Sequence, residues 1–226
     1  MRRAYRPEEK ESRRQAILAG ALQLFQETPY PDLRMTDLAS RLGLGKGTLY
    51  LYFPTKESLF LAVLQAELAA WFQQAARLLE ATEAGIDPAA VAGELVGELV
   101  RHPLLPRLQA LLHGVLERNV PVAEAGAFAR FLQDGVVKVG TRLERVLPGL
   151  APGRGPLYLI RFHGLVIGSQ LMAARPPGVR AAIQDPDMAL FDFSFESVLR
   201  GTAVDLLAGM LSRAPAQGAA GSLMAV

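Results

Sequence analysis

Four hydrogen-bond donors lie close together in one short stretch of the chain. They are the ammonium of Lys46 and the hydroxyl groups of Thr48, Tyr50 and Tyr52. Groups of this kind donate to the phosphate oxygens and base edges of DNA. Residues 46–53 are predicted to form a short helix, and a helix is the element that fits the major groove. The chemistry indicated is therefore nucleic-acid recognition.

A helix-turn-helix is the arrangement that would position these donors. Residues 37–42 are predicted to form its first helix, with Thr36 as N-cap and the small Ala39 where the second helix crosses. Gly43 supplies a turn residue that tolerates positive φ. Four apolar residues can fill the angle between the helices: Leu38, Leu42, Leu44 and Leu49. An ordinary helical hairpin with a glycine turn is the alternative that this spacing leaves open.

The rest of the sequence is predicted to be all-α, because apolar residues recur every three or four positions and prolines separate the segments. No internal repeat or alternating strand pattern is found. The expected helices cover residues 10–27, 37–42, 46–53, 55–82, 88–100, 102–119, 122–146, 157–174 and 187–211. Residues 179–183 can hold one further helical turn.

Charge is unevenly distributed along the chain. Residues 1–60 hold ten Lys and Arg against seven Asp and Glu, a balance of +3, whereas residues 61–226 hold fourteen against fifteen, a balance of −1. A basic segment favours binding to phosphate, because binding releases the counterions condensed on DNA.

Several kinds of site are not expected. The chain has no cysteine, which excludes disulfides and thiolate metal sites. The three histidines His102, His113 and His163 are scattered, so neither a metal nor another cofactor is predicted. No Gly-x-Ser-x-Gly elbow or phosphate-binding glycine loop supports an enzyme. Without a secretory signal or a membrane-spanning segment, we expect a cytoplasmic protein with no membrane partner.

Two segments carry a family resemblance. Residues 36–39, TDLA, and residues 42–59, LGLGKGTLYLYFPTKESL, closely resemble the signature of TetR/AcrR-family transcriptional regulators. The resemblance is dense over residues 12–65 and extends in layout to the whole chain. It implies an all-α fold in which an N-terminal three-helix DNA-binding domain is joined by a long helix to an all-helical ligand-binding and dimerisation domain. The implied divisions are residues 1–58 with a basic arm at 1–10, residues 59–212, and a flexible tail at 213–226.

The resemblance also implies the DNA contacts. By position these are Thr36, Lys46, Gly47, Thr48, Tyr50, Leu51, Tyr52 and Lys56. Lys56 matches a phosphate contact at the start of the long helix, where the helix N-terminus also favours an anion. Arg2, Arg3 and Arg6 form an arm that can reach the backbone or the minor groove.

Two positions depart from the family pattern. Gly45 stands where serine is usual, so one phosphate donor is missing. Leu51 stands where a polar, base-reading residue is common. Leucine cannot hydrogen-bond a base edge but can contact the methyl group of thymine. A leucine that is simply exposed or packed in the protein is the equal alternative.

The body is expected to form a homodimer through residues 157–174 and 187–211. The proposed contacts are Leu165, Gly168, Leu171, Val198, Gly201 and Leu206. Packing of these faces inside one subunit is the alternative.

The family resemblance also implies a ligand pocket, but the sequence does not locate it. Its candidate residues, which suit a core equally well, are Trp71, Leu108, Leu112, His113, Phe128, Phe131, Phe162 and His163.

Together these features predict a transcriptional repressor. The homodimer would bind a palindromic double-stranded DNA operator and be released by a small hydrophobic or amphipathic effector. Two other classes stay open at this point. One is an enzyme or carrier with an all-helical small-molecule site, and the other is a DNA-binding protein of low sequence specificity, which Leu51 and the basic arm would suit.

Overall fold

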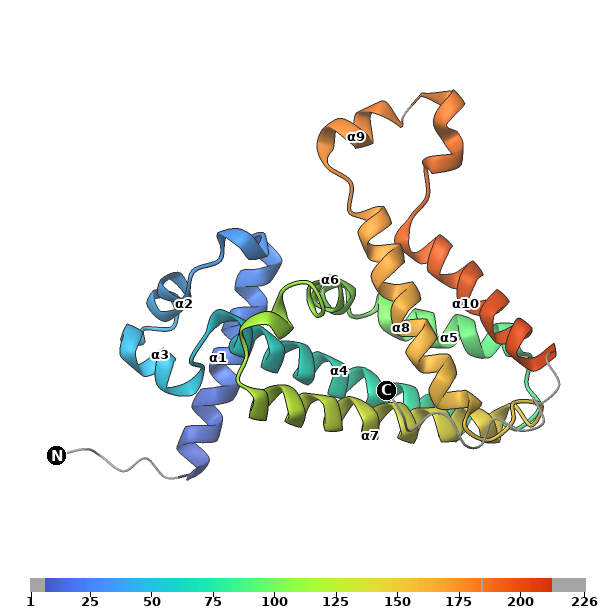
Figure 1. Cartoon of the computed structure of the whole chain (residues 1–226), viewed down its shortest axis with the longest axis horizontal. Coiled ribbons are helices and arrows are strands. Elements are labelled where there is room, and N and C mark those ends of the chain that lie inside the picture. Colours follow the sequence, from blue (N-terminus) through green and yellow to red (C-terminus); the bar gives the residue numbers. More distant parts are fainter. Residues whose placement is uncertain (1–6, 184, 213–226) are drawn as a thin grey trace. The chain divides into compact units, whose positions relative to one another are not determined.

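The computed structural model describes residues 7–183 and 185–212, and within these ranges every regular element is a helix. The predicted all-α class is confirmed. In chain order (Figure 1) the elements are α1 (Pro7–Glu27), η1 (Tyr30–Asp32), α2 (Met35–Arg41), α3 (Lys46–Tyr52), α4 (Lys56–Ala81), α5 (Pro88–Val100), α6 (Leu104–Leu111), η2 (Leu116–Asn119), α7 (Val122–Val146), α8 (Arg154–Ala173), α9 (Pro177–Ala182), η3 (Pro186–Phe191) and α10 (Phe195–Ser212).

The described residues form two compact units. The first unit lies within residues 1–70 and 102–132, and the second lies within residues 71–101 and 133–226. Two of the three boundaries between them fall inside α4 and α7, and the third falls between α5 and α6. The predicted domain boundaries after residues 58 and 212 separate expected functions, whereas these units are defined by packing. The predicted boundaries therefore stay predictions. Residues 7–10 of the predicted arm belong to α1, while residues 1–6 and the predicted tail at 213–226 lie outside the described residues.

The first unit has an apolar core because α1 places its large apolar residues on one face. Ile17, Ala21 and Phe25 recur at spacings of four residues and are buried, as are Leu38 of α2 and Leu49 of α3. The first half of α4 adds Leu59, Phe60 and Leu64, and α6 and η2 add Leu105, Leu108 and Leu116.

Two predicted helices are interrupted in the structure. The segment 102–119 divides into α6 and η2, because the chain turns after Leu111 and thereby buries Leu116 completely. The segment 187–211 divides into η3 and α10. Ser194 and Ser197 account for this break, because each hydroxyl accepts from the other residue's backbone N–H, at 3.1 and 3.2 Å. This reciprocal cap begins a new helix at Phe195.

In the second unit α8 lies against α10, and α10 lies against α5 (Figure 1). The Tyr158 hydroxyl of α8 donates to the carbonyl of Ala203 in α10 at 3.4 Å. Arg200 of α10 donates to the carbonyl of Gly93 in α5 at 3.0 Å. These contacts fix α10 between two neighbours by both burial and hydrogen bonding.

A pair of glycines sets how closely α7 and α8 approach. A Cβ atom added to Gly155 would lie 2.0 Å from the carbonyl oxygen of Gly140, closer than any packed atoms can be. The Glu144 carboxylate then accepts from the Gly155 backbone N–H at 2.8 Å, which satisfies a free donor at the start of α8. Only glycine at position 155 permits this crossing.

We therefore expect Gly155→Ala to destabilise the protein by about 1–3 kcal/mol, since the methyl group must displace backbone atoms. Thermal unfolding measures this loss. Gly97→Ala in α5 is the matched control, because its Cβ would meet only the end of a flexible arginine side chain at 4.0 Å. The control should be neutral or stabilising by up to about 1 kcal/mol. Equal melting temperatures for both variants would contradict the packing described here.

Candidate nucleic-acid interface

The turn between α2 and α3 has the geometry that the sequence predicts. Gly43 has φ of +62°, a left-handed conformation that favours glycine. The N–H of Gly43 donates to the carbonyl of Ser40 at 3.2 Å, and the N–H of Leu44 donates to that of Ala39 at 2.8 Å. This pair of bonds is a Schellman motif, which ends α2 and turns the chain toward α3.

The predicted N-cap at Thr36 is wrong. α2 begins at Met35 and its N-cap is Arg34, so Thr36 lies inside the first turn. Its exposed hydroxyl contacts the carboxylate of Asp37 at 3.4 Å. The earlier start allows Met35 to be buried. Thr55 caps α4, because its hydroxyl accepts from the Ser58 backbone N–H at 2.9 Å.

α3 presents a mixed face rather than a row of donors. Leu49 is completely buried, whereas Lys46, Gly47, Tyr50 and Leu51 are exposed. The Lys46 ammonium lies 5.9 Å from the centre of the Tyr50 ring, so a positive charge and a phenol lie together on the exposed face. The other two predicted donors, Thr48 and Tyr52, are half-buried.

Leu51 is the most exposed large hydrophobic residue of α3, with 77% of its surface accessible. The alternative of a leucine packed in the protein core is therefore excluded. An exposed leucine beside Lys46 and Tyr50 is available to a DNA surface. Whether it contacts a thymine methyl group stays a prediction.

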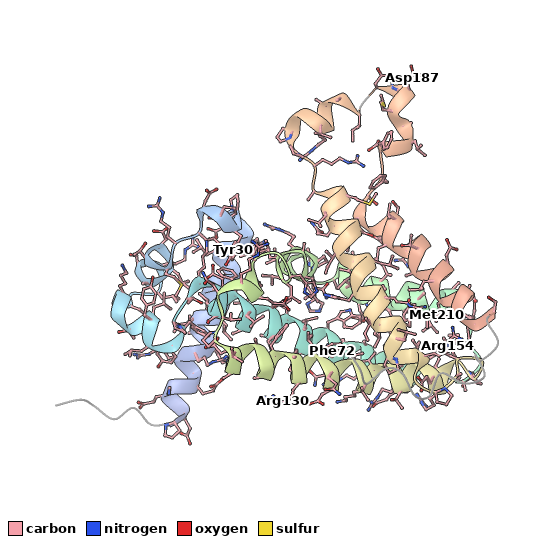
Figure 2. The ribbon with its side chains drawn as sticks, in the orientation of Figure 1. Tyr30, Phe72, Arg130, Arg154, Asp187 and Met210 are labelled. Atoms are coloured by element: carbon pink, nitrogen blue, oxygen red, sulfur yellow. The ribbon has the colours of Figure 1, made fainter. Side chains whose placement is uncertain are left out.

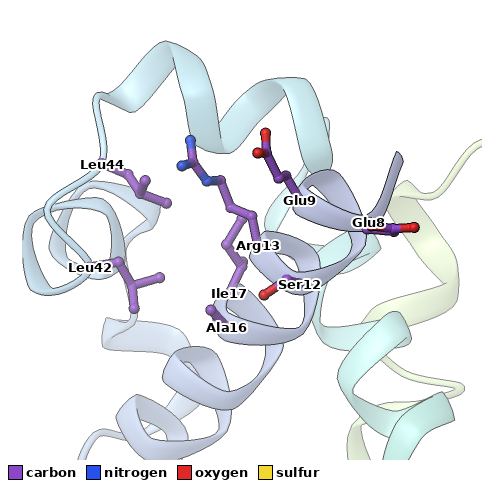
Figure 3. A pocket seen from close by; sticks show the side chains of 8 residues that line it. All are labelled: Glu8, Glu9, Ser12, Arg13, Ala16, Ile17, Leu42 and Leu44. Carbon is purple, nitrogen blue, oxygen red and sulfur yellow. The ribbon is translucent and has the colours of Figure 1, made fainter. Parts of the chain in front are cut away.

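A close approach that sequence reasoning missed holds α1 against α2. A Cβ atom on Gly20 would lie 2.8 Å from Leu42, so glycine lets α1 pack at the end of α2. Beside this contact is an open hollow of about 590 Å³, lined by Glu8, Glu9, Ser12, Arg13, Ala16, Ile17, Leu42 and Leu44 (Figure 3). Leu42 and Leu44 are consequently half-buried rather than filling the angle between helices completely. The carboxylates of Glu8 and Glu9 make this hollow unfavourable for phosphate.

The Lys56 side chain is turned toward η1. Its ammonium donates to the carbonyls of Tyr30 at 2.9 Å and Leu33 at 3.1 Å, and it lies 4.2 Å from the centre of the Tyr30 ring (labelled in Figure 2). The Tyr30 hydroxyl contacts the Glu57 carboxylate at 3.4 Å. Burial raises the pKa of Tyr30 well above its ordinary value, and the nearby Glu57 charge raises this pKa further. Tyr30 is thus held as the neutral phenol.

Arg107 is a second residue that sequence reasoning did not identify. Its guanidinium donates to the Phe25 carbonyl at 3.2 Å and lies 4.7 Å from the centre of the Phe25 ring. This contact joins α6 to the end of α1. A single arginine in a predicted helix carries no signal of such a partner 82 residues away.

The predicted pocket residues are divided between the two units. In the first unit Leu108, Leu112 and Phe128 are buried and Phe131 is half-buried, with the Phe128 and Phe131 rings 6.2 Å apart. His113 is mostly exposed and lies 3.0 Å from Glu117. In the second unit the rings of Trp71 and Phe162 stack at 6.2 Å, and His163 is half-buried. Their role in ligand binding stays a prediction.

None of the predicted dimer contacts is buried in the single chain. Leu165, Gly168, Val198 and Leu206 are half-buried, and Gly201 is exposed. Leu171 has 61% of its surface accessible, and its α8 neighbour Ile160 has 59%. α8 therefore exposes apolar surface that the described residues of its own chain do not cover.

Within residues 7–183 and 185–212, none of the helices combines the length and apolar character needed to cross a membrane. The same residues contain no group of three or more His, Asp or Glu side chains that could hold a metal ion.

Comparison with known families assigns both parts of the sequence. Residues 17–63 match the family described as bacterial regulatory proteins, tetR family. Residues 65–214 match the tetracyclin repressor-like C-terminal domain.

Individual curated relatives match over part of the chain. The regulator EthR of Mycobacterium tuberculosis is 40% identical over 73 residues, which are 30% of this chain and 33% of EthR. The regulator RutR of Escherichia coli is 37% identical over 60 residues, 26% of this chain and 28% of RutR. The chain thus matches about a third or less of the length of these curated relatives.

Solved structures share the fold over most of the chain. A transcriptional regulator from Cytophaga hutchinsonii has a TM-score of 0.54 at 23% identity, covering 87% of this chain and 95% of that one. FadR of Bacillus subtilis, solved in complex with stearoyl-CoA, has a TM-score of 0.53 at 13% identity, covering 87% and 98%. At these identities the likeness concerns the fold alone.

The fold, the turn geometry and these matches define a helix-turn-helix transcription regulator. The chain belongs to the TetR family. Proteins of this family are DNA-binding regulators rather than enzymes, so the prediction that the chain is no enzyme is confirmed.

The two leucines of α3 provide a test of this geometry. We expect Leu49→Ala to cost about 2–5 kcal/mol, because it leaves a cavity in the core of the first unit. The same substitution at Leu51 should change stability by no more than about 0.5 kcal/mol, since that side chain is exposed. Chemical denaturation of the two variants measures both values. A large loss of stability in Leu51→Ala would show that Leu51 is packed.

Proposed function

We propose that this protein is a ligand-responsive transcriptional repressor that binds a palindromic operator as a homodimer. The observation that carries this proposal is the face of α3, where Lys46, Gly47, Tyr50 and Leu51 are exposed around the buried anchor Leu49. An exposed helix with a cation and a phenol suits the major groove. Thr36, Thr48 and Tyr52 would donate from its flanks to the DNA backbone.

The uncovered apolar residues of α8 support the homodimer. Ile160 and Leu171 would leave water if α8 and α10 packed against the same helices of a second copy. A two-fold protein of this kind places two α3 helices in successive major grooves, about 34–36 Å apart. The operator would then be palindromic because the protein is symmetric.

The repressor would be released by a small hydrophobic or amphipathic effector bound in the body. The apolar character of the candidate residues supports this class of molecule. α4 begins in the first unit, directly after α3, and ends in the second unit. A displacement of α4 would therefore move α3. Effector and operator must then weaken each other's binding by the same factor.

A gel-shift experiment with the DNA upstream of the protein's own gene tests the function. We expect a shift that an excess of random duplex does not remove. A shift removed equally by random DNA would indicate a binder of low specificity, and no shift at all would contradict the proposal. An effector is then sought as a compound that dissociates the complex, and a bound compound that left operator affinity unchanged would contradict the switch.

A separate prediction concerns the role of Leu51 in recognising the DNA sequence. If its side chain contacts a thymine methyl group, replacing that thymine by uracil should weaken wild-type binding by about fourfold, the value of roughly one buried methyl group. Leu51→Ala should bind both duplexes equally, because the side chain that covers the methyl group is gone. Fluorescence anisotropy titrations of the four combinations measure the coupling. An equal effect of uracil on both proteins would mean that Leu51 reads no thymine.

A further inference from the structure

The second unit contains a layer of aromatic rings around Trp71, the one tryptophan of the sequence. The rings of Trp71 and Phe162 stack at 6.2 Å with 20° between their planes, and those of Phe162 and Tyr158 stack at 5.9 Å and 16°. The Phe72 ring (labelled in Figure 2) lies 5.5 Å from Trp71 in an edge arrangement. Trp71 and Phe72 belong to α4, and the other two rings belong to α8. These rings hold the end of α4 against α8.

The indole N–H of Trp71 lies inside this layer. Trp71 has 5% of its surface accessible, and its enclosed Nε1–H has no hydrogen-bond acceptor among the described residues. The buried Tyr158 hydroxyl differs, because it donates to the Ala203 carbonyl at 3.4 Å. Most buried polar groups in proteins are paired, and an unpaired donor loses the hydrogen bonds that water would give it. The indole N–H therefore offers a hydrogen bond that a bound molecule can accept.

The surroundings of the indole determine which molecule would suit it. Tryptophan is a donor only, so the partner must be an acceptor. Aromatic side chains contact planar apolar surfaces favourably. A neutral ketone oxygen accepts from an N–H without bringing a charge into this layer, whereas a carboxylate would need a buried cation beside it. A planar, largely apolar molecule with one neutral acceptor meets these conditions.

Binding at the indole would also move helices. Because Nε1 is enclosed, a molecule reaches it only after the rings of α8 part from those of α4. The molecule then binds the parted arrangement better than the closed one, and so favours it. A site at Trp71 therefore couples binding to a displacement between α4 and α8.

We propose that Trp71 is a ligand-binding residue, which selects small, planar, largely apolar molecules that carry a neutral hydrogen-bond acceptor such as a ketone oxygen. The indole N–H donates to that oxygen, and the rings of Phe72 and Phe162 contact the apolar part. The inference rests on the proposed function, because such a molecule would be the effector. It adds the chemical group by which the effector is recognised.

The first experiment tests the unpaired donor in the full chain without ligand. Expression with benzothienylalanine in place of tryptophan changes position 71 alone, and it exchanges the indole N–H for a sulfur atom. We expect the melting temperature to rise by about 2–4 °C, because the native state no longer encloses an unpaired donor. An equal or lower melting temperature would mean that the N–H is paired, and it would overturn the proposal.

The second experiment measures ligand binding to the full chain by NMR, with an isotope-labelled indole nitrogen that gives a single signal. The probes are acetophenone and acetonaphthone, each compared with the analogue in which a methylene group replaces the ketone oxygen. We expect each ketone to bind about tenfold more tightly than its analogue and to shift the indole proton downfield, since only the ketone accepts from Nε1–H. Equal affinities within both pairs, or no binding of either ketone, would overturn the proposal.

Substituted proteins locate the donor. With benzothienylalanine at position 71, ketone and analogue should bind equally, and a retained preference would overturn the proposal. Trp71→Phe serves the same purpose if that replacement fails to fold. Tyr158→Phe is the matched control, because it removes a hydroxyl of the same layer that is already paired with Ala203. This control should retain the tenfold preference, and its loss would show that the preference does not depend on the indole alone and would overturn the assignment.

The inference and the proposed function fail separately, because these titrations contain no DNA. If wild-type protein bound no operator, the proposed function would fail, and the ketone preference would still decide the role of Trp71. If a ketone bound at the indole but left operator affinity unchanged, the binding site would stand and its role as the effector site would be wrong.

Discussion

The burial of Leu49 is the constraint on which the exposed face of α3 depends. This one side chain fixes the rotation of α3 about its axis, because it is completely enclosed while Tyr50 and Leu51 beside it are exposed. A seven-residue helix cannot hold its own orientation in water, so tertiary packing must supply it. The Gly43 turn sets where α3 begins relative to α2, and the close contact of Gly20 with Leu42 sets α2 against α1.

A series of ring–ring and cation–π contacts connects the helices of the first unit. The Phe60 ring of α4 lies 5.7 Å from Phe25 and 5.2 Å from Tyr30. Arg107 lies over the Phe25 ring, and Lys56 lies over the Tyr30 ring. Each contact is worth only about 0.5–2 kcal/mol. Together they join α6, α1, η1 and α4, so the elements that carry α3 are held as one body.

The sequence predicts the parts of this structure that local patterns encode. Helix periodicity predicts the all-α fold, and glycine tolerance of positive φ predicts the turn at Gly43. Local patterns fail where a distant side chain decides the outcome. The burial of Met35 moved the start of α2 ahead of the predicted cap at Thr36. The reciprocal serine cap that divided the predicted last helix is local, since Ser194 and Ser197 are three residues apart, and the prediction overlooked it. The partners of Lys56 and Arg107 lie 23 to 26 and 82 residues away, beyond the reach of any motif.

Protection of a single thiol by DNA tests the central claim most directly. The chain has no cysteine, so Leu51→Cys places one reactive group on the exposed face of α3. Val122→Cys in α7 is the control, because that position is 89% exposed on another helix. Alkylation is followed with and without a saturating duplex taken from upstream of the gene. If α3 is the reading helix, the duplex slows alkylation at position 51 and leaves the control unchanged. Equal alkylation rates at position 51 with bound and free DNA would contradict the account.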